Sequence, residues 1–258
     1  MLIVLSPAKD LDTEKLASAP LTSIPSHLER SALLAAKLRA MPASKLARPM
    51  DISPKLAELN HDRWQRWTPK VDAERSRPAV FLFNGEAYRG LGARTLASAD
   101  LRHAQQHVRI LSGLYGMLRP LDLIQPHRLE MGTRLPVDQK TRNLYTFWKT
   151  PLAEEVTLTL NELDTNVIVN LASSEYFKAL SGISKGIRVV TPVFKDLIEG
   201  QLRMVMVFAK HQRGSMARFA IKHRIADTEG LKEYRENGYR MDAQLSTPDE
   251  WVFVRATR

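Results

Sequence analysis

The stretch VRILSGLYG, residues 108–116, carries the pattern that decides the fold: a buried apolar run ends and a Ser-Gly turn follows at once. The same order recurs where LIVL (2–5) precedes SPAK, VFLF (80–83) precedes NGE, and VIVN (167–170) precedes LASSE. Short runs of apolar, β-branched or aromatic residues predict strands, several of them buried on both faces. If these strands are mainly parallel, their carboxyl ends share one sheet edge, where polar turns form the usual crevice for a ligand.

Further strands and helices are predicted around these four segments. Three more strands are expected at RVV (188–190), LRMVMVF (202–208) and WVFVR (251–255). Helices are expected after Ser26 with Glu29, from Ser53 and Pro54 to Trp67, from Ser98 to His107, from Thr146 to Leu163, and after Ser215. No repeat or clear linker divides the chain. We therefore predict one composite domain over residues 1–258, a mixed α/β (α+β) fold with a central mixed sheet and flanking helices.

The composition restricts the partners and the compartment. The 258 residues include 38 Lys and Arg against 28 Asp and Glu, which gives a formal charge of +10. This balance favours polyanionic partners such as nucleic acid, although many proteins are basic only for solubility. The absence of Cys excludes disulfides and thiolate metal sites, and neither a signal peptide nor a membrane-spanning apolar run is visible. We expect a cytoplasmic protein outside the membrane.

The predicted turns and the cations near them indicate an anion site. Ser112 and Gly113 leave backbone N–H groups free at a strand end, which suits phosphate. SGLYG matches neither dinucleotide-binding nor P-loop spacing, and any one such turn alone is explained as a tight connection. Asp122 is expected to brace Arg119. The cations that could hold phosphate are Lys9, Arg119, Arg128, Arg134, Lys195, Arg213 and Arg218, with Arg134 equally explained as surface charge.

A second candidate anion site is YRGLGA, residues 88–93, which lies between a short helical stretch and the predicted helix SADLRHAQQH. A hydrophobic residue between Gly90 and Gly92, next to Arg89, fits a helix-hairpin-helix whose turn presents N–H groups to a DNA phosphate without reading sequence. Gly-x-Gly is also common in plain loops. The basic charge of the chain favours the hairpin interpretation.

Acid–base chemistry has candidates that the sequence does not separate from structural partners of Arg. They are Lys9, Tyr115, Asp122, Glu130 and Glu175. No Ser, His and acid grouping can be assembled.

Metal binding and base stacking have weaker signals. His103 and His107 are four residues apart on a predicted helix but lack a third ligand, so an exposed helix face is the preferred interpretation. Met204 and Met206 are expected to fill the core, and Trp64 and Trp67 are expected to pack helices rather than stack on bases. We therefore predict no metal and no cofactor.

Several long segments, in order along the chain, resemble the YaaA family of peroxide stress proteins. They are MLIVLSPAKDL (1–11), FNGEAYRGL (83–91), ILSGLYGMLRPLDLIQPHRLEMGTRL (110–135), NLYTFWK (143–149), VNLASSEYFKAL (169–180) and AKHQRGSMARF (209–219). His127 departs from the family motif, which has Tyr there. The resemblance implies a bacterial cytoplasmic protein with a basic cleft, a helix-hairpin-helix and DNA-binding activity, and a part in limiting free intracellular iron under peroxide stress.

Two functions from different classes remain open. The first is largely sequence-independent binding of double-stranded, distorted or unpaired DNA by a monomer, with phosphates held by the hairpin and the cleft cations. The second is an enzyme acting on a nucleotide or nucleic-acid base, in which Lys9 and Arg119 stabilise charge and Glu175 or Tyr115 moves a proton. Direct iron binding by carboxylates and His is a third interpretation, for which no compact ligand set is visible.

Overall fold

Four parallel strands form the centre of the sheet, and the apolar runs predict all four. They lie in the order β3 (Val108–Ser112), β1 (Leu2–Leu5), β6 (Val167–Leu171) and β7 (Arg188–Ile198). All residues of β1 and β3 are buried, as expected for strands covered on both faces. The computed structural model describes residues 1–14, 21–71 and 74–256. In that part of the chain, the predicted parallel arrangement of the strands is confirmed.

Antiparallel strands complete the sheet at both ends. β4 (Gly116–Leu118) pairs with β3 at one edge, and β9 (Arg240–Asp242) pairs with β10 (Glu250–Ala256) at the other. β10 runs parallel to β7, and β8 (Gln201–Arg203) pairs with the end of β7. The resulting order is β4-β3-β1-β6-β7-β10-β9, while β2 (Arg77–Pro78) and β5 (Leu123–Ile124) form a separate pair. The central sheet is therefore mixed, as predicted.

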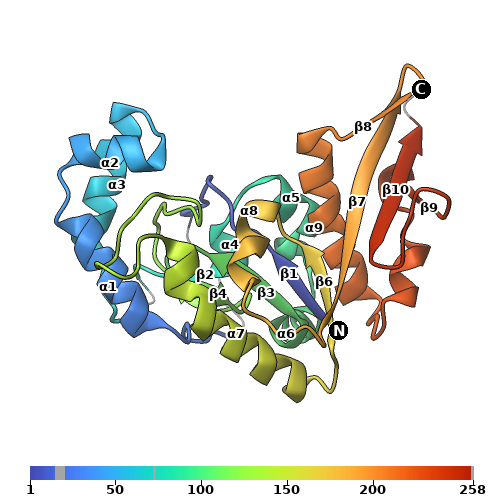
Figure 1. Cartoon of the computed structure of the whole chain (residues 1–258), viewed down its shortest axis with the longest axis horizontal. Helices are drawn as coiled ribbons and strands as arrows, with labels where there is room; N and C mark the ends of the chain where they lie inside the picture. Colours follow the sequence, from blue (N-terminus) through green and yellow to red (C-terminus); the bar gives the residue numbers. More distant parts are fainter. Residues whose placement is uncertain (15–20, 72–73, 257–258) are drawn as a thin grey trace.

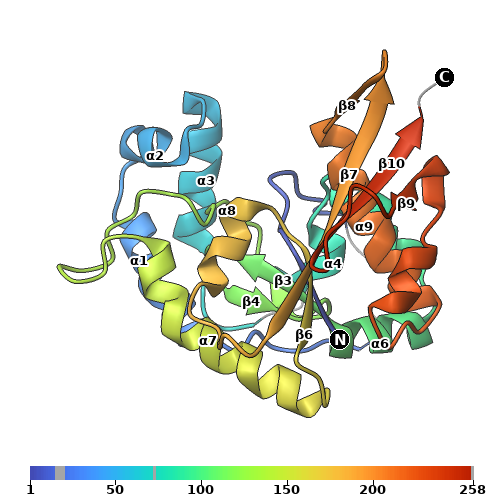
Figure 2. The same cartoon turned by 45° about the vertical axis from the view of Figure 1, so that its right-hand side comes forward.

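Helices surround the sheet and gather at its ends. They are α1 (Leu28–Arg39), α2 (Ala43–Met50), α3 (Pro54–Arg66), α4 (Ala79–Leu82), α5 (Glu86–Leu91), α6 (Ser98–His107), α7 (Leu144–Glu162), α8 (Ser174–Phe177) and α9 (Met206–Lys222). Short 3-10 helices are η1 (Ala93–Thr95), η2 (Lys178–Leu180), η3 (Glu229–Glu233) and η4 (Glu236–Gly238). Helices α1 to α3 lie at one end of the molecule and the pair β7 and β10 at the other (Figures 1 and 2). The carboxyl ends of β1, β3 and β6 lie between them.

The predicted helix starts are right in some places and wrong in others. Ser53 caps α3 by accepting a hydrogen bond from the Leu56 N–H, and α7 continues through Pro151. Ser26 does not cap α1, because the helix begins one residue later than that cap requires. Ser98 is the first residue of α6 rather than its cap.

The run VFLF (80–83) is not a strand, because Ala79–Leu82 form the short helix α4. The first two N–H groups of this helix donate to the carbonyl oxygens of Asp122 and Pro120 instead of to a neighbouring strand. All four helical residues are buried, so the sequence shows the same unbroken apolar run that a buried strand would show. Periodicity cannot separate the two cases over so short a run.

The run LRMVMVF (202–208) is also not one strand. β8 ends at Arg203 and α9 begins at Met206, so Ser215 lies inside α9 and does not cap it. Met204 and Met206 are 43% and 53% exposed, so the prediction that they fill the core is wrong. The buried positions of α9 recur at helical spacing from its first turn, and this period marks the helix more reliably than its apolar character.

One cluster of buried apolar side chains extends from Met1 to Phe253 and joins the sheet to the helices on both sides. Trp64 and Trp67 belong to it, at 0% and 3% exposure, so they pack helices as predicted. The predicted class, a single mixed α/β domain, is confirmed. Within the described ranges, no helix has both the length and the apolarity that crossing a membrane requires.

Candidate functional site

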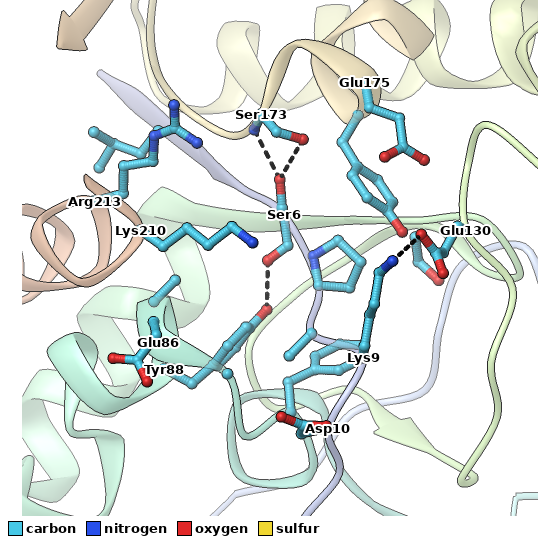
Figure 3. Close-up of a pocket in the computed structure, with 18 of the residues that line it drawn as sticks. Ser6, Lys9, Asp10, Glu86, Tyr88, Glu130, Ser173, Glu175, Lys210 and Arg213 are labelled. Carbon is cyan, nitrogen blue, oxygen red and sulfur yellow. Dashed lines mark hydrogen bonds and ion pairs between the residues drawn. The ribbon is translucent and has the colours of Figure 1, made fainter. Parts of the chain in front are cut away.

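A cavity of about 660 Å³ opens where β1, β3 and β6 end. The segments that follow β1 and β6 enter it at Ser6–Asp10 and at Ser173–Tyr176, and Ser112 closes it at the end of β3. Gly85–Arg89 line it although α4, not a strand, precedes them. Two further walls come from residues 127–130 and from α9. The four turns singled out in the sequence thus meet at one cavity (Figure 3).

Ser6, Ser173 and Tyr88 form a hydrogen-bond network in the lining of the cavity. Ser6 Oγ accepts a hydrogen bond of 2.8 Å from the Ser173 N–H and lies 3.3 Å from Ser173 Oγ. The Tyr88 hydroxyl donates to the Ser6 carbonyl oxygen at 2.9 Å. The turns after β1 and β6 are therefore tied directly to α5, and Figure 3 shows Ser6 between the other two side chains.

One wall carries linked charges. Lys9 Nζ lies 2.8 Å from one oxygen of Glu130, and Arg128 donates to the other oxygen at 3.0 Å. Glu175 accepts a 2.9 Å hydrogen bond from the Gly132 N–H, and no cation pairs with it among the described residues. The wall therefore presents one neutralised carboxylate, on Glu130, and one that lacks a cation, on Glu175.

The opposite wall is α9, and the two cations that it contributes to the cavity have no carboxylate partner among the described residues. Lys210 and Arg213 lie three residues apart on one helix face and line the cavity, where Figure 3 shows Lys210 extending toward Ser6. Within the described ranges, neither side chain has a hydrogen bond or an ion pair. Burial lowers the pKa of Arg213, and no neighbouring charge contributes. Arg89, in contrast, is paired with Glu86.

The loop between β3 and α7 is braced behind the cavity. A Cβ on Gly113 would overlap the Leu129 carbonyl, so only glycine lets the turn after β3 approach the segment that leads to Glu130. The buried Asp122 carboxylate accepts from the Arg119 N–H at 2.8 Å and from Arg119 Nε at 3.2 Å. This geometry is the brace expected for Asp122.

His127 supplies an uncharged imidazole to the same wall. Its Nδ1 lies 2.8 Å from the Gln125 carbonyl oxygen, which can only accept, so Nδ1 carries the hydrogen. Burial lowers the pKa of His127 to about 4. The ring packs edge-on against Tyr115 at 5.1 Å between ring centroids. His127 is therefore neutral near pH 7, with Nε2 as a hydrogen-bond acceptor.

The predicted site residues divide into two groups. Those that line the cavity are Lys9, Arg89, Ser112, Arg128, Glu130, Glu175 and Arg213. Those that do not are Gly90, Gly92, Gly113, Tyr115, Arg119, Asp122, Arg134, Lys195 and Arg218. Arg119 lines a smaller cavity of about 320 Å³ beside α7, and Lys195 lies within β7 opposite Val254. What each residue binds stays a prediction.

Tyr115 has a structural role at its position. It is 1% exposed, and its hydroxyl oxygen accepts from Trp67 Nε1 at 3.0 Å and from the Gln125 N–H at 3.2 Å. Burial raises the pKa of Tyr115 to about 12. A side chain so enclosed does not line the cavity, and its position favours a structural role over proton transfer.

The glycine turn of the predicted hairpin is packed against α9. Gly92 has φ +55° and ends α5, as the predicted tight turn requires. Gly90 faces the backbone of His211, and Arg218 donates to the carbonyl oxygens of Leu91 and Gly92 at 3.0 Å each. The glycines and the Arg therefore hold α5 and α9 together, and their use for DNA phosphates stays a prediction.

Sequence reasoning missed Lys210 as a site residue. The predicted strand ends at Phe208 and the predicted helix begins only at Ser215, so Lys210 falls in neither element, whereas α9 places it one turn before Arg213. The sequence places Tyr88 only in the predicted hairpin, whereas in the structure this residue also lines the cavity, where its hydroxyl donates to Ser6. The helical period of residues 206–222 was the signal that could have revealed Lys210.

No metal centre is visible in the part of the chain that the structure describes, since no three His, Asp or Glu side chains are grouped to hold an ion. The His103 and His107 rings lie 4.3 Å apart, and His107 Nδ1 is 3.2 Å from the Met1 carbonyl oxygen. Burial lowers the pKa of His103 to about 4.

Known sequences match nearly the whole chain. A UPF0246 protein of Ralstonia nicotianae is 47% identical over 99% of both chains, and one of Cupriavidus metallidurans is 45% identical over 99% of this chain and 98% of its own. A UPF0246 protein of Tolumonas auensis is 45% identical with the same coverage. The profile of the family described as peroxide stress protein YaaA matches residues 1–245. This chain therefore belongs to the YaaA family of peroxide stress proteins.

Proposed function

We propose that this protein binds DNA largely without sequence specificity during peroxide stress, and that the cavity receives one unpaired nucleotide of that DNA. The observation that carries the proposal is the cavity itself, which collects five cations from distant segments: Lys9, Arg89, Arg128, Lys210 and Arg213. The net charge of +10 supports contact with the DNA backbone outside the cavity.

The size of the cavity decides which part of DNA enters it. Its volume of about 660 Å³ falls in the range of roughly 300–1,000 Å³ that suits small ligands. A duplex is far larger, so it lies across the rim, where Lys9, Arg89 and Lys210 are exposed. Taking a base out of the stack costs a few kcal/mol, and less when the base is already unpaired. Distorted or unpaired DNA is therefore the favoured partner.

The α5–η1–α6 segment is proposed as a second contact with the backbone. Arg89 and Arg94 are exposed on this segment, which follows the cavity wall directly. Contacts of this type hold phosphates and carry no sequence information. In this role the α5–η1–α6 segment acts as the expected helix-hairpin-helix.

The salt dependence of DNA binding tests the proposal. We expect a labelled duplex with one unpaired nucleotide to bind with a slope of log K against log salt of roughly −3 to −4, if about four phosphates are contacted. A fully paired duplex of the same sequence should bind more weakly with a similar slope. Affinities that do not change with salt, or that are equal for the two duplexes, would contradict the proposal.

The cellular part of the proposal is that DNA binding protects the cytoplasmic chromosome and helps limit free iron during peroxide exposure. Family membership supports the stress context. Deleting the gene should raise both DNA lesions and free iron after peroxide, and an Arg213→Gln allele should reproduce the first effect. Unchanged lesion counts in both strains would contradict a protective role.

A second candidate function is an enzyme that acts on the nucleotide in the same cavity. The observation in its favour is that Glu175, without a cation, lies on the same wall as the Lys9–Glu130 pair, so a proton acceptor and a cation line one space. Incubation with nucleotides and damaged DNA, followed by mass spectrometry, tests it. Product that forms with wild-type protein and is lost in Glu175→Gln supports catalysis, and product equally abundant in that variant contradicts it.

A further inference from the structure

The cavity has an uneven distribution of charge that a plain DNA-binding groove does not require. Among the described residues, Lys210 and Arg213 on the α9 wall have no ion pair, while Lys9 and Arg128 on the opposite wall are both paired with Glu130. The two unpaired cations and the charges gathered around Glu130 are therefore on separate sides of the cavity (Figure 3). An asymmetric cavity favours a ligand with two chemically different ends.

We infer that the α9 wall is a subsite for a terminal phosphate, and that the cavity holds a nucleoside monophosphate, either free or at the end of a DNA strand. This inference rests on the proposed function and names the ligand of the same cavity. Lys210 and Arg213 bind the phosphate, and Glu175 accepts an N–H group of the base.

The charge on the α9 wall favours a phosphate monoester over a diester. Lys210 and Arg213 are on the same face of the helix, and together they bring two positive charges that no carboxylate of the described residues neutralises. A phosphodiester inside a strand carries one negative charge, whereas a terminal phosphate carries nearly two at pH 7. A terminal phosphate therefore matches the wall more fully.

The partial burial of Arg213 strengthens the attraction. Burial lowers the pKa of this guanidinium because the charge has lost water without gaining a partner. A phosphate supplies that partner, and the planar Arg fork can bind two of its oxygens. Lys210 is exposed at the mouth of the cavity and can contact the same group from the solvent side.

The rest of the cavity suits the nucleoside. Glu175 uses one oxygen to accept from Gly132 and has its second oxygen available for a donor on the ligand. The rings of Phe83 and Tyr88 line the same space, with centroids 5.3 Å apart, and offer apolar surface to a base. Cations on one wall, an acceptor on the opposite wall and apolar rings in the lining are the groups that a nucleotide site requires.

Calorimetric titration of the full chain with a deoxynucleoside 5′-monophosphate, the matching nucleoside and inorganic phosphate tests the inference. We expect the monophosphate to bind at least about tenfold more tightly than the nucleoside. Its affinity should rise between pH 5.5 and 7.5, because the second phosphate pKa is about 6. Equal affinities for nucleotide and nucleoside, or no change with pH, would overturn the inference.

Variants locate the phosphate. Arg213→Gln and Lys210→Gln should each weaken the monophosphate by about tenfold and leave nucleoside binding unchanged. Arg102→Gln and Lys185→Gln remove the same charges from exposed positions outside the cavity and serve as matched controls. Equal losses in the variants and their controls would mean that only net charge matters, which overturns the subsite.

Oligonucleotides separate the two sources of the phosphate. A strand with a 5′-phosphate should bind more tightly than the same strand with a 5′-hydroxyl if the ligand is a DNA end, and equally if it is only the free nucleotide. Salt-sensitive DNA binding with no preference for the 5′-phosphate strand, together with no preference for the nucleotide over the nucleoside, would overturn the inference and leave the proposed function standing. Nucleotide binding without DNA binding would overturn the proposed function and leave the nucleotide subsite standing.

Discussion

Arg213 and Arg218 lie five residues apart on α9, and the structure uses them in opposite ways. Arg213 lines the cavity and has no partner among the described residues, whereas Arg218 donates to two carbonyl oxygens at the end of α5. The sequence predicts both as anion-binding residues. The difference shows that the partners a cation already has, rather than its residue type, decide whether it is available to a ligand.

The same contrast holds for the two regions around them. In the cavity, turns from β1 and β6 leave side chains facing an open space. Where the glycine hairpin packs on α9, Gly90 of α5 and Gly214 of α9 allow the two helix backbones to touch. We therefore expect substitutions at this contact to change stability and substitutions in the cavity to change binding.

The largest expected effect is at Gly214, on the α9 side of the contact with α5. A Cβ on Gly214 would overlap the Ala87 carbonyl, so Gly214→Ala should lower the free energy of unfolding by about 3 kcal/mol or more. Gly186, whose Cβ would meet only Ser184 Oγ at 3.8 Å, provides the control Gly186→Ala, with a change within about 0.5 kcal/mol. Denaturant unfolding measures both. Equal stabilities would show that α5 and α9 are not in backbone contact.

Acid should destabilise the cavity wall through His127. Its folded pKa of about 4 lies below the ordinary value of 6.5, so the unfolded chain binds more protons between these values. Stability is therefore complete above about pH 6.5 and falls as the pH drops toward 4, by up to roughly 3 kcal/mol. His127→Phe should flatten this dependence, because the group that titrates is removed. The dependence that remains should come from His103, which titrates in both proteins. An unchanged pH profile would place the His127 ring in water.

The arginine pair should show opposite effects. Arg218→Gln should lower the free energy of unfolding by about 1–2 kcal/mol, because two carbonyl oxygens lose a charged donor, and leave nucleotide affinity within about twofold. Arg213→Gln should weaken binding and leave stability unchanged or slightly higher, because a desolvated charge disappears. Thermal unfolding and calorimetric titration of both variants decide the matter. Parallel effects in the two variants would remove the distinction between the regions.

The smallest expected effect on stability is at the mouth of the cavity. Lys9 is 62% exposed, so its ion pair with Glu130 contributes little, and Lys9→Ala should change the free energy of unfolding by less than about 0.5 kcal/mol. DNA affinity should fall a few-fold, more at low salt than at high salt. A stability loss above about 1 kcal/mol would make Lys9 a structural residue.

The sequence predicts β1, β3, β6, β10 and the start of β7, because these segments are short apolar or β-branched runs. It does not predict the strands β4 and β9 at the two edges of the sheet. It does not predict α4, whose four buried residues have the composition of a strand. It also misplaces the start of α9, because Met204 and Met206 are apolar yet exposed. In α4, burial alone does not distinguish a helix from a strand. At Met204 and Met206, an apolar side chain does not correspond to a buried position.

The site is predictable only in part. The turns after β1, β3 and β6 can be placed together because parallel strands end at one edge. The orientation of Tyr115 into the core and of Arg218 onto α5 depends on long-range packing. Lys210 becomes a site residue only once α9 is known to begin before it. Which partner each polar or charged side chain has depends on the tertiary structure, and a single sequence does not show it.

Competition between DNA and a free nucleotide tests most directly whether the cavity is where DNA binds. A labelled duplex with one unpaired terminal nucleotide is bound to the protein, and a deoxynucleoside 5′-monophosphate or the matching nucleoside is added while fluorescence anisotropy is recorded. We expect the monophosphate to displace the duplex and the nucleoside to leave it bound at the same concentration. A duplex that stays bound when the cavity is saturated with nucleotide would contradict the account and place the DNA site elsewhere on the molecule.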